Sequence, residues 1–423
     1  MIRAHRARAL GAPALVLGLL MVASAPAAAA TFKPNRFDDP RPGGCKPSDC
    51  SVREAVIAAN KRSGRDTIRL AKGTYELTRE EAPSDPNNSR RGDLDLIDDA
   101  NVVGAGARKT ALDAGSSTDV GGILHVQGSS NAYALRDLTL QHGAATDPGG
   151  GIRADNIGGS LSVVRVKVTD NYSASSGGGI YSAAAELKIT KSTIADNRAD
   201  SQGGGIFLPA TGGAGPAITS IRSSTISGNR AAGDGGGLAA NGTDVGGFPN
   251  PPQATVLNST FALNETSGSG GGIRAVQGAT VALDNVTVAH NDAETDGAGL
   301  GTGGGISRAA SAGPFAIGDV LVADNTVGAT GNGAECAGAF SGQNGNVVQL
   351  QMGTACSIGG GLSEPADALI GPLANNGGST KTVALLDGSA AIEFAESCPA
   401  KDQRGLTRPA VDCDAGAFEH QGP

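Results

Sequence analysis

Six asparagines recur in one local setting along the middle of the chain, and three of them directly follow an aspartate. Each asparagine stands three positions after an apolar residue, and the six are Asn171, Asn197, Asn229, Asn264, Asn291 and Asn325. The aspartates are Asp170, Asp196 and Asp324, and stacking would place them in one acidic row. Carboxylate oxygens in such a row could bind Ca²⁺. However, Arg198 and Arg230 follow two of the asparagines and would weaken that field, so we interpret the row as solvated turn charges.

The asparagines themselves fit a structural role better than a binding role. Asparagine tolerates left-handed backbone conformations. Its side-chain amide can also bond the asparagine one turn further along a stack, which would satisfy buried polar groups. We therefore predict a stacked asparagine ladder that contains no catalytic residue and holds no cofactor.

Side chains that could act as acids or bases are scattered. Asp98 and Asp99 form an adjacent acidic pair near the start of the repeats, while His125, His142 and His290 stand far apart in the sequence. Hydrolysis of a glycosidic bond needs two close carboxylates, and elimination from a uronate needs an Arg or Lys base with a cation. The Gly-His-Gly and Arg-Ile-Lys motifs of pectin hydrolases are absent. These observations favour a non-catalytic protein.

A second group of charged residues lies close to the C-terminus. It comprises Asp402, Arg404, Arg408, Asp412, Asp414 and Glu419. We predict ion pairs that fix the end of the fold, with a structural Ca²⁺ site as the alternative. No other metal or cofactor is expected.

The elements that position these residues form a repeat. A glycine-rich turn begins six positions after each asparagine, while the spacing between successive asparagines varies from 26 to 35 residues. The glycines are Gly177, Gly203, Gly235, Gly270, Gly297 and Gly331, and Gly143 with Gly149 indicates a seventh, degenerate copy. A constant element joined by variable loops is typical of a solenoid. Within one copy, residues 180–181, 187–189 and 192–194 have the apolar alternation of three short strands. The sequence therefore predicts an all-β fold, a parallel β-helix.

The two ends of the solenoid have different patterns. Ser51-Val52-Arg53-Glu54 is a capping box, and apolar residues follow it at helical spacing. Because the first turn of a solenoid leaves its core open, we expect residues 31–64 to form an N-terminal capping segment with a short helix. Residues 65–364 would form the coils, and residues 365–423 a C-terminal closing segment.

Residues 1–30 have the form of a secretion signal, with a basic start, an apolar middle and a small-residue end. Their removal would take away three arginines and no acid, which changes the net charge from −8 to −11. This balance argues against nucleic acid or an anionic membrane surface as a partner. The remainder has no apolar run near the roughly 20 residues needed to span a bilayer. We expect a secreted or cell-surface protein that is a monomer.

All six cysteines follow the signal, and an even number in an exported chain favours disulfides. Bonded cysteines need Cα atoms within about 7 Å, and stacked coils advance roughly 4.8 Å each. Cysteines on opposite sides of the stack are then too far apart to join. This leaves Cys45–Cys50, with Cys336–Cys356 and Cys398–Cys413 as the simplest pairing behind, although other connectivities and a metal site stay open.

Three motifs resemble known families. Residues 50–55, Cys-Ser-Val-Arg-Glu-Ala, are similar to the Cys-Ser-Leu-Arg-Glu-Ala signature of exported bacterial β-helix proteins. The repeat, including Phe261-Ala262-Leu263-Asn264, resembles that of chlamydial polymorphic outer-membrane proteins. Residues 402–419 are similar to a C-terminal domain that precedes various cell-surface anchors. The resemblance implies a right-handed parallel β-helix and an exported or surface location, and it implies no catalytic residues.

From these observations we expect a non-catalytic, adhesin-like β-helical rod that binds a polysaccharide or a surface protein. Polysaccharide lyases and pectin hydrolases also use this fold, so a polysaccharide lyase or glycoside hydrolase is the alternative. A structural spacer is the third candidate. A cleft with converging carboxylates and a basic residue would favour an enzyme, whereas a flat face with repeated polar residues would favour binding.

Overall fold

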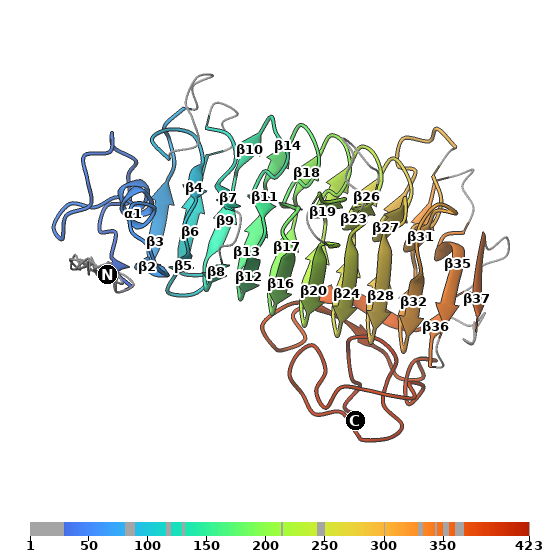
Figure 1. Cartoon of the computed structure of the whole chain (residues 1–423). Coiled ribbons are helices and arrows are strands. Elements are labelled where there is room, and N and C mark those ends of the chain that lie inside the picture. Colours follow the sequence, from blue (N-terminus) through green and yellow to red (C-terminus); the bar gives the residue numbers. More distant parts are fainter. Residues whose placement is uncertain are drawn as a thin grey trace, which may run out of the picture.

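The computed structural model describes residues 29–80, 89–115, 120–128, 132–212, 215–242, 250–299, 301–328, 333–342, 345–349, 355–359 and 368–422. Most of the expected secretion signal and the predicted repeat glycine Gly331 lie outside these residues. The described chain is a stack of coils, which we call the rod, with a C-terminal segment along its side (Figure 1). The prediction of a right-handed parallel β-helix is confirmed.

The coils build three parallel sheets. A 20-stranded sheet contains two series of strands. The first series is β4 (Leu94–Leu96), β7 (Leu124–Gly128), β11 (Ile152–Ile157), β15 (Ile180–Ser182), β19 (Ile206–Pro209), β23 (Leu238–Asn241), β27 (Ile273–Val276), β31 (Ile306–Arg308), β35 (Cys336–Gly342) and β37 (Ala355–Gly359). The second is β1 (Thr31–Phe32), β2 (Asp66–Arg69), β5 (Ala100–Val103), β8 (Ala132–Arg136), β12 (Ser160–Val164), β16 (Glu186–Thr190), β20 (Ile218–Arg222), β24 (Gln253–Leu257), β28 (Thr280–Asp284) and β32 (Phe315–Gly318).

The other two parallel sheets complete each coil. A ten-stranded sheet contains β3 (Gly73–Glu76), β6 (Thr110–Asp113), β9 (Thr139–Gln141), β13 (Lys167–Thr169), β17 (Thr193–Ala195), β21 (Thr225–Ser227), β25 (Thr260–Ala262), β29 (Thr287–Ala289), β33 (Leu321–Ala323) and β36 (Val347–Val348). A seven-stranded sheet contains β10 (Ala144–Ala145), β14 (Tyr172–Ser173), β18 (Arg198–Ala199), β22 (Arg230–Ala231), β26 (Glu265–Thr266), β30 (Asp292–Ala293) and β34 (Thr326–Val327).

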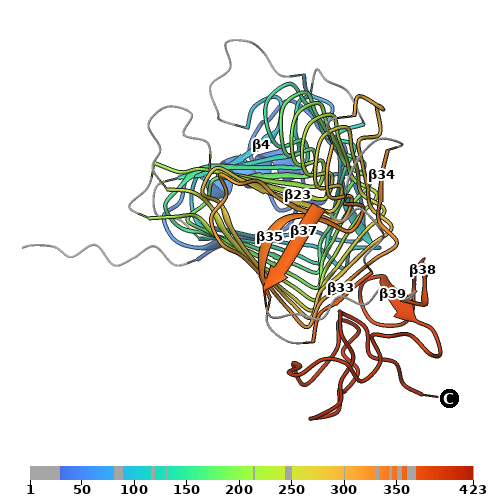
Figure 2. The ribbon, with the colours of Figure 1, turned by 90° about the vertical axis from the view of Figure 1, so that its right-hand side faces the viewer.

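A middle coil therefore has four strands, not the predicted three. The fourth is a two-residue strand directly after the asparagine, such as β18. It was missed because two residues are too few to give a periodic signal. Inward positions are aliphatic and fully buried, as for Ile180, Leu187, Ile189 and Ile194. Figure 2 shows the coils superimposed in a view along the rod.

The asparagines form a column inside the rod. From Asn171 to Asn291, the backbone N–H and Nδ2 of each asparagine donate to Oδ1 of the asparagine one coil further on, as Asn197 does to Asn229 at 3.1 and 2.9 Å. Nδ2 also donates to a carbonyl of the preceding coil, which for Asn197 is Val168 O at 3.0 Å. Gly143 donates its N–H to Asn171, so it occupies the column as the degenerate copy.

We had assigned the left-handed backbone conformation to the asparagine itself. In the structure, the residue directly before the asparagine has this conformation. This residue has a φ near +60° in every coil from His142 to Asp324, including Leu263 at +61° and His290 at +57°. The corner turns at this residue, while the asparagine points inward. The acidic row thus occupies strained corner positions, which aspartate tolerates better than most residues.

We had predicted that the glycine-rich turn always begins six positions after the asparagine. This prediction is wrong for the last two copies. The glycine at the left-handed turn position is Gly303 after Asn291, with a φ of +65°, and Gly333 after Asn325, with a φ of +73°. These two positions align because Ile306 pairs with Cys336 and with Ile273 of the preceding coil. Gly297 instead lies in a loop with open space around its Cα. A longer loop displaced the turn without changing the stacking.

The N-terminal cap agrees with the prediction in detail. Helix α1 (Val52–Ala59) begins at Ser51 with both bonds of the capping box, and it is the only helix in the described residues. It is too short to cross a membrane. Arg53 is fully buried and pairs with Asp39 at 2.7 Å, which ties the helix to the preceding loop. Glu54 accepts bonds from the N–H groups of Gly43 and Gly44 at 2.7 and 3.0 Å.

We had expected the C-terminal segment to close the end of the rod. In the structure it does not. Residues 368–422 lie along the ten-stranded sheet, beneath the strands of the later coils (Figures 1 and 2). The antiparallel hairpin β38 (Ile370–Ala374) and β39 (Thr382–Leu385) packs on Ala262 and Ala289 through Val383. The small side chains of that sheet allow the close approach.

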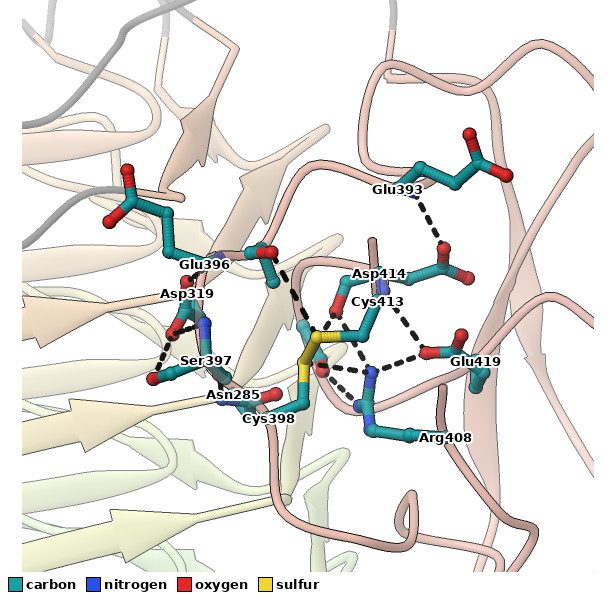
Figure 3. The surroundings of a disulfide bond; sticks show 12 residues. Asn285, Asp319, Glu393, Glu396, Ser397, Cys398, Arg408, Cys413, Asp414 and Glu419 are labelled. Atoms are coloured by element: carbon teal, nitrogen blue, oxygen red, sulfur yellow. Dashed lines mark hydrogen bonds and ion pairs between the residues drawn. A yellow bond between two sulfur atoms is a disulfide. The ribbon is translucent and has the colours of Figure 1, made fainter. Parts of the chain in front are cut away.

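The six cysteines form the three disulfides Cys45–Cys50, Cys336–Cys356 and Cys398–Cys413, with Cα atoms 4.3, 5.5 and 6.4 Å apart. The first lies beside α1, the second joins β35 to β37, and the third holds the C-terminal segment (Figure 3). No cysteine is left free.

Candidate functional site

The second strand series of the 20-stranded sheet presents a flat polar face. Outward positions on successive coils align in register, and the central column reads Ser162, Lys188, Ser220, Thr255, Ala282 and Ala316. The residues on either side of Ser220, Thr219 and Ile221, are buried, whereas Lys188 and Thr255 are exposed. This column and its neighbours on β12 to β28 form what we call the open face.

The first strand series carries a charged network at its N-terminal coils. His125 on β7 lies between two carboxylates, with Nε2 2.7 Å from Asp155 and Nδ1 3.4 Å from Asp95. Asp155 also accepts from Arg153 Nε at 2.7 Å, and Arg153 Nη1 donates to Asp147 at 2.8 Å. The chain of contacts Asp95, His125, Asp155, Arg153, Asp147 alternates in charge and carries three negative and two positive groups.

Burial and pairing fix the protonation of this network. Burial alone would lower the pKa of His125, but the hydrogen bonds with Asp155 and Asp95 raise it to about 9. Burial alone would raise the pKa of Asp155, yet the hydrogen bond and charge of His125, with Arg153, lower it. His125 is therefore a cation at neutral pH. With both ring nitrogens facing carboxylates, it has no free nitrogen to act as a base.

Two aromatic residues continue the same outward row. Tyr181 follows Arg153 in register on β15, and Phe207 follows Tyr181 on β19. Their rings are stacked with centroids 5.8 Å apart, and both side chains are half-buried while their neighbours Ile180 and Ile206 are fully buried. Burial first, and the charge of Asp155 second, raise the pKa of Tyr181, so its hydroxyl stays protonated.

The Tyr181 hydroxyl differs from the other tyrosine hydroxyls. Tyr75 donates to Pro34 O at 3.4 Å, Tyr133 to Gln127 O at 2.6 Å and Tyr172 to Asp200 at 2.5 Å. Within the described part of the chain, Tyr181 has no hydrogen-bond partner. A protonated hydroxyl on a half-buried ring is thus left to bond a ligand or solvent.

The predicted acid–base residues do not come together. Asp98 accepts the N–H of Asp99 at 2.8 Å, and Asp99 accepts the N–H of Ala132 at 2.7 Å, so both act in turns. His142 pairs with Asp113 at 2.9 Å. His290 lies 3.2 Å from Gly371 O of the C-terminal segment. These contacts are structural.

In the acidic row considered for Ca²⁺, Asp170 accepts from Thr169 Oγ1 at 2.7 Å. The acidic group near the C-terminus forms ion pairs. In the C-terminal segment Arg408 pairs with Glu419 and Arg404 with Asp402, each at 2.7 Å, as the ion-pair prediction states. Asp414 accepts the N–H of Glu393 at 2.8 Å (Figure 3). Among the described residues, no group of three or more acidic, histidine or cysteine side chains has an arrangement that could hold a metal ion.

In the described part of the chain, two of the cavities lie away from the charged network. One, of about 350 Å³, lies between Glu76, Glu80 and Asp113 at the first coils. The other, of about 310 Å³, lies in the C-terminal segment between Glu393, Asp412 and His420. Both are lined by acidic side chains.

Two features were missed from the sequence. Glu335 occupies the position of the third repeat glycine, because Ile306 pairs with Cys336, and its carboxylate accepts from Asn325 Nδ2 at 2.6 Å. Burial raises the pKa of Glu335 to about 8, with a smaller contribution from the charge of Asp324. The alternation Ile180-Tyr181-Ser182 and Ile206-Phe207-Leu208 could have indicated the outward aromatic pair, and Gly333-Ala334-Glu335 the altered turn.

Comparison with known proteins identifies the fold alone. No model of a protein family matches the sequence, and no curated protein matches it. Pectate lyase Pel9A has a similar structure, with a TM-score of 0.50 and 14% identity over 94% of this chain and 98% of that chain. The A-module of mannuronan C-5 epimerase AlgE6 from Azotobacter vinelandii gives a TM-score of 0.38 with 17% identity, over 79% of this chain and 100% of that chain.

Proposed function

We propose that this chain is an exported, monomeric, non-catalytic β-helical rod that binds glycans along the 20-stranded sheet. The observation that carries the proposal is the open face, where the hydroxyl side chains Ser162, Ser220 and Thr255 and the charged Lys188 follow one another at the coil spacing and are partly or fully exposed. Repeated hydrogen-bonding groups on a rigid sheet can contact successive units of a polymer without ordering a loop, so binding loses little conformational entropy.

Export is supported by the three disulfides, because such bonds persist in oxidising compartments. The secretion-signal pattern of residues 1–30 and the likeness of residues 50–55 to exported β-helix proteins agree with it. A surface protein as the partner stays a possible outcome of the test below.

The test is incubation of the purified protein with neutral and uronate polysaccharides, with and without Ca²⁺, followed by affinity electrophoresis and analysis of products. We expect retention by a glycan without new chain ends. The double variant Ser220→Glu, Thr255→Glu should lower retention because it places two charges on the open face. Thr193→Glu, on the ten-stranded sheet, is the matched control and should not. Equal retention of both variants would mean that the glycan binds elsewhere than on the open face.

A polysaccharide-cleaving enzyme is the second candidate, and one observation favours it. Asp95, His125, Asp155 and Arg153 gather at one place on the rod, and pectate lyase Pel9A shares the fold. New chain ends or unsaturated products in the same incubation would support this candidate and overturn the proposal. His125→Asn would then be the first variant to assay. Retention by no glycan would favour a protein partner or a spacer.

A further inference from the structure

The row formed by Asp155, Arg153, Tyr181 and Phe207 has the components of a sugar site. Half-buried aromatic rings provide an apolar surface for the C–H groups of a pyranose, and an amphipathic tyrosine adds a polar tip. Tyrosine and phenylalanine are scarce in this chain, at 4 and 9 of 423 residues, so two stacked rings on the outside of adjacent coils are unusual for its composition.

The polar members are held in place before a ligand arrives. Arg153 is fixed by Asp155 and Asp147 at 2.7 and 2.8 Å, and Asp155 is fixed in turn by His125 at 2.7 Å. The guanidinium is a donor and the carboxylate an acceptor, so the pair can bond adjacent sugar hydroxyls. Because these side chains are already ordered, they lose little rotamer freedom on binding.

The Tyr181 hydroxyl completes the set. It lacks a partner in the described part of the chain, whereas the other three tyrosine hydroxyls are bonded. A hydroxyl can donate and accept at once, which suits another hydroxyl group as its partner.

Charge limits the kind of sugar. Each cation of the network already faces a carboxylate, and three carboxylates stand against two cations. The region therefore has no unpaired positive group to attract a uronate, and its net charge would repel one.

We propose that Tyr181, Phe207, Arg153 and Asp155 form a subsite for an uncharged hexose or pentose unit of a neutral glycan. This subsite lies on the first strand series of the 20-stranded sheet, not on the open face of the second series. It rests on the proposed glycan-binding function and goes beyond it by assigning a ligand class. Tyr181 and Phe207 would contact the ring, while Arg153 and Asp155 would bond its hydroxyls. His125 acts as a positioning residue through Asp155.

The experiment measures binding of the full protein to dextran, β-mannan and xylan, with polygalacturonate and alginate as charged probes. For the neutral glycan that binds, Tyr181→Phe should weaken affinity about tenfold, the loss of one hydrogen bond. Tyr181→Ala should weaken it further because the ring is also lost. The matched control Tyr172→Phe removes a hydroxyl that is bonded within the protein and should leave affinity unchanged.

The outcomes separate the subsite from the general function. Neutral glycan binding that is equal in the wild type and Tyr181→Ala would overturn the subsite and leave the proposed function standing. Tighter binding of a uronate than of any neutral glycan would overturn the charge argument. Binding of none of the five probes would overturn both proposals. Tyr181→Phe removes a group with no partner in the described residues, so it should melt like the wild type, and a changed affinity would not come from misfolding.

Discussion

Outward threonine side chains are buried on one face of the rod and exposed on another. On the ten-stranded sheet, Thr225, Thr260 and Thr287 are aligned on adjacent coils and fully buried by the C-terminal segment. Gln403 donates to Thr225 at 2.9 Å and accepts from Thr260 at 2.7 Å, and Ala417 donates to Thr287 at 2.9 Å. On the open face, Thr255 occupies an equivalent outward position but is exposed.

The difference shows where outward polar groups form hydrogen bonds within the chain rather than with solvent or a ligand. The next column of the ten-stranded sheet reads Gln141, Thr169, Ala195, Ser227, Ala262, Ala289 and Ala323. Alanine thus occupies this column where the hairpin of the C-terminal segment packs, at Ala262 and Ala289. The open face has no such alanine run in its central coils, which agrees with a surface available to a partner.

The largest expected effect comes from breaking the self-contact. Arg408→Met removes a buried cation that pairs with Glu419 and donates to Asp414 O and Gly416 O. Loss of one partner of a buried ion pair typically costs about 3–5 kcal/mol. We expect a lower urea midpoint and rapid proteolysis within residues 368–422. The exposed pair at Arg198 provides the control, since Arg198→Met should leave both readings near the wild type. Unchanged proteolysis would mean that Arg408 does not hold the segment.

The second expected effect is a pH dependence of stability that comes from a residue inside the rod, not on either face. The pKa of Glu335 is raised from its usual 4.5 to about 8 by burial. A raised acid stabilises the folded state below the unfolded pKa and loses that contribution as pH rises through 8. The free energy of unfolding should therefore fall between pH 5 and pH 9, and Glu335→Gln should flatten this fall. His125, whose pKa is raised to about 9, contributes in the same direction, so part of the fall remains in the variant. Parallel pH profiles of variant and wild type would count against this assignment.

The smallest expected effect, a difference in stability between two threonine variants, tests the contrast between the two faces most directly. Thr260→Val leaves Oε1 of buried Gln403 without its donor, which costs about 1–3 kcal/mol. Thr255→Val changes an exposed residue with no such partner and should stay within about 0.5 kcal/mol of the wild type. Chemical denaturation of the two variants side by side measures the difference. Equal losses would show that the two faces are not distinguished by self-contact.

The repeat made the fold predictable because the apolar positions, the asparagines and the first glycines all depend on local spacing. The capping box before α1 was predictable for the same reason. The lateral position of residues 368–422 was not, because it depends on which coils meet a segment more than 100 positions away, as for Gln403 and Thr260. The availability of Tyr181 was likewise hidden, since a missing partner has no sequence signal.

Some misses had a readable signal. Leu263 stands at a left-handed corner and is 48% exposed, although its type predicts burial. Its place directly before Asn264, where other copies have aspartate, glycine or histidine, marks it as a corner residue. The strict offset of six failed at Gly297 because loop length, unlike coil stacking, is free to vary.

The asparagine column also has a polarity. From Asn171 to Asn291, each Oδ1 accepts from the preceding member of the column, while each Nδ2 donates to the next asparagine as well as to a carbonyl of the preceding coil; Asn325 donates to the carboxyl group of Glu335. A coil inserted anywhere between these ends would find a donor on one side and an acceptor on the other. Glu335 accepts from both the backbone N–H and Nδ2 of Asn325, so its carboxyl takes the acceptor place of a next asparagine and ends the series. The chain can therefore gain or lose internal coils in evolution without new chemistry, while the asparagine column ends at one glutamate and the strands β35, β36 and β37 continue the rod beyond it.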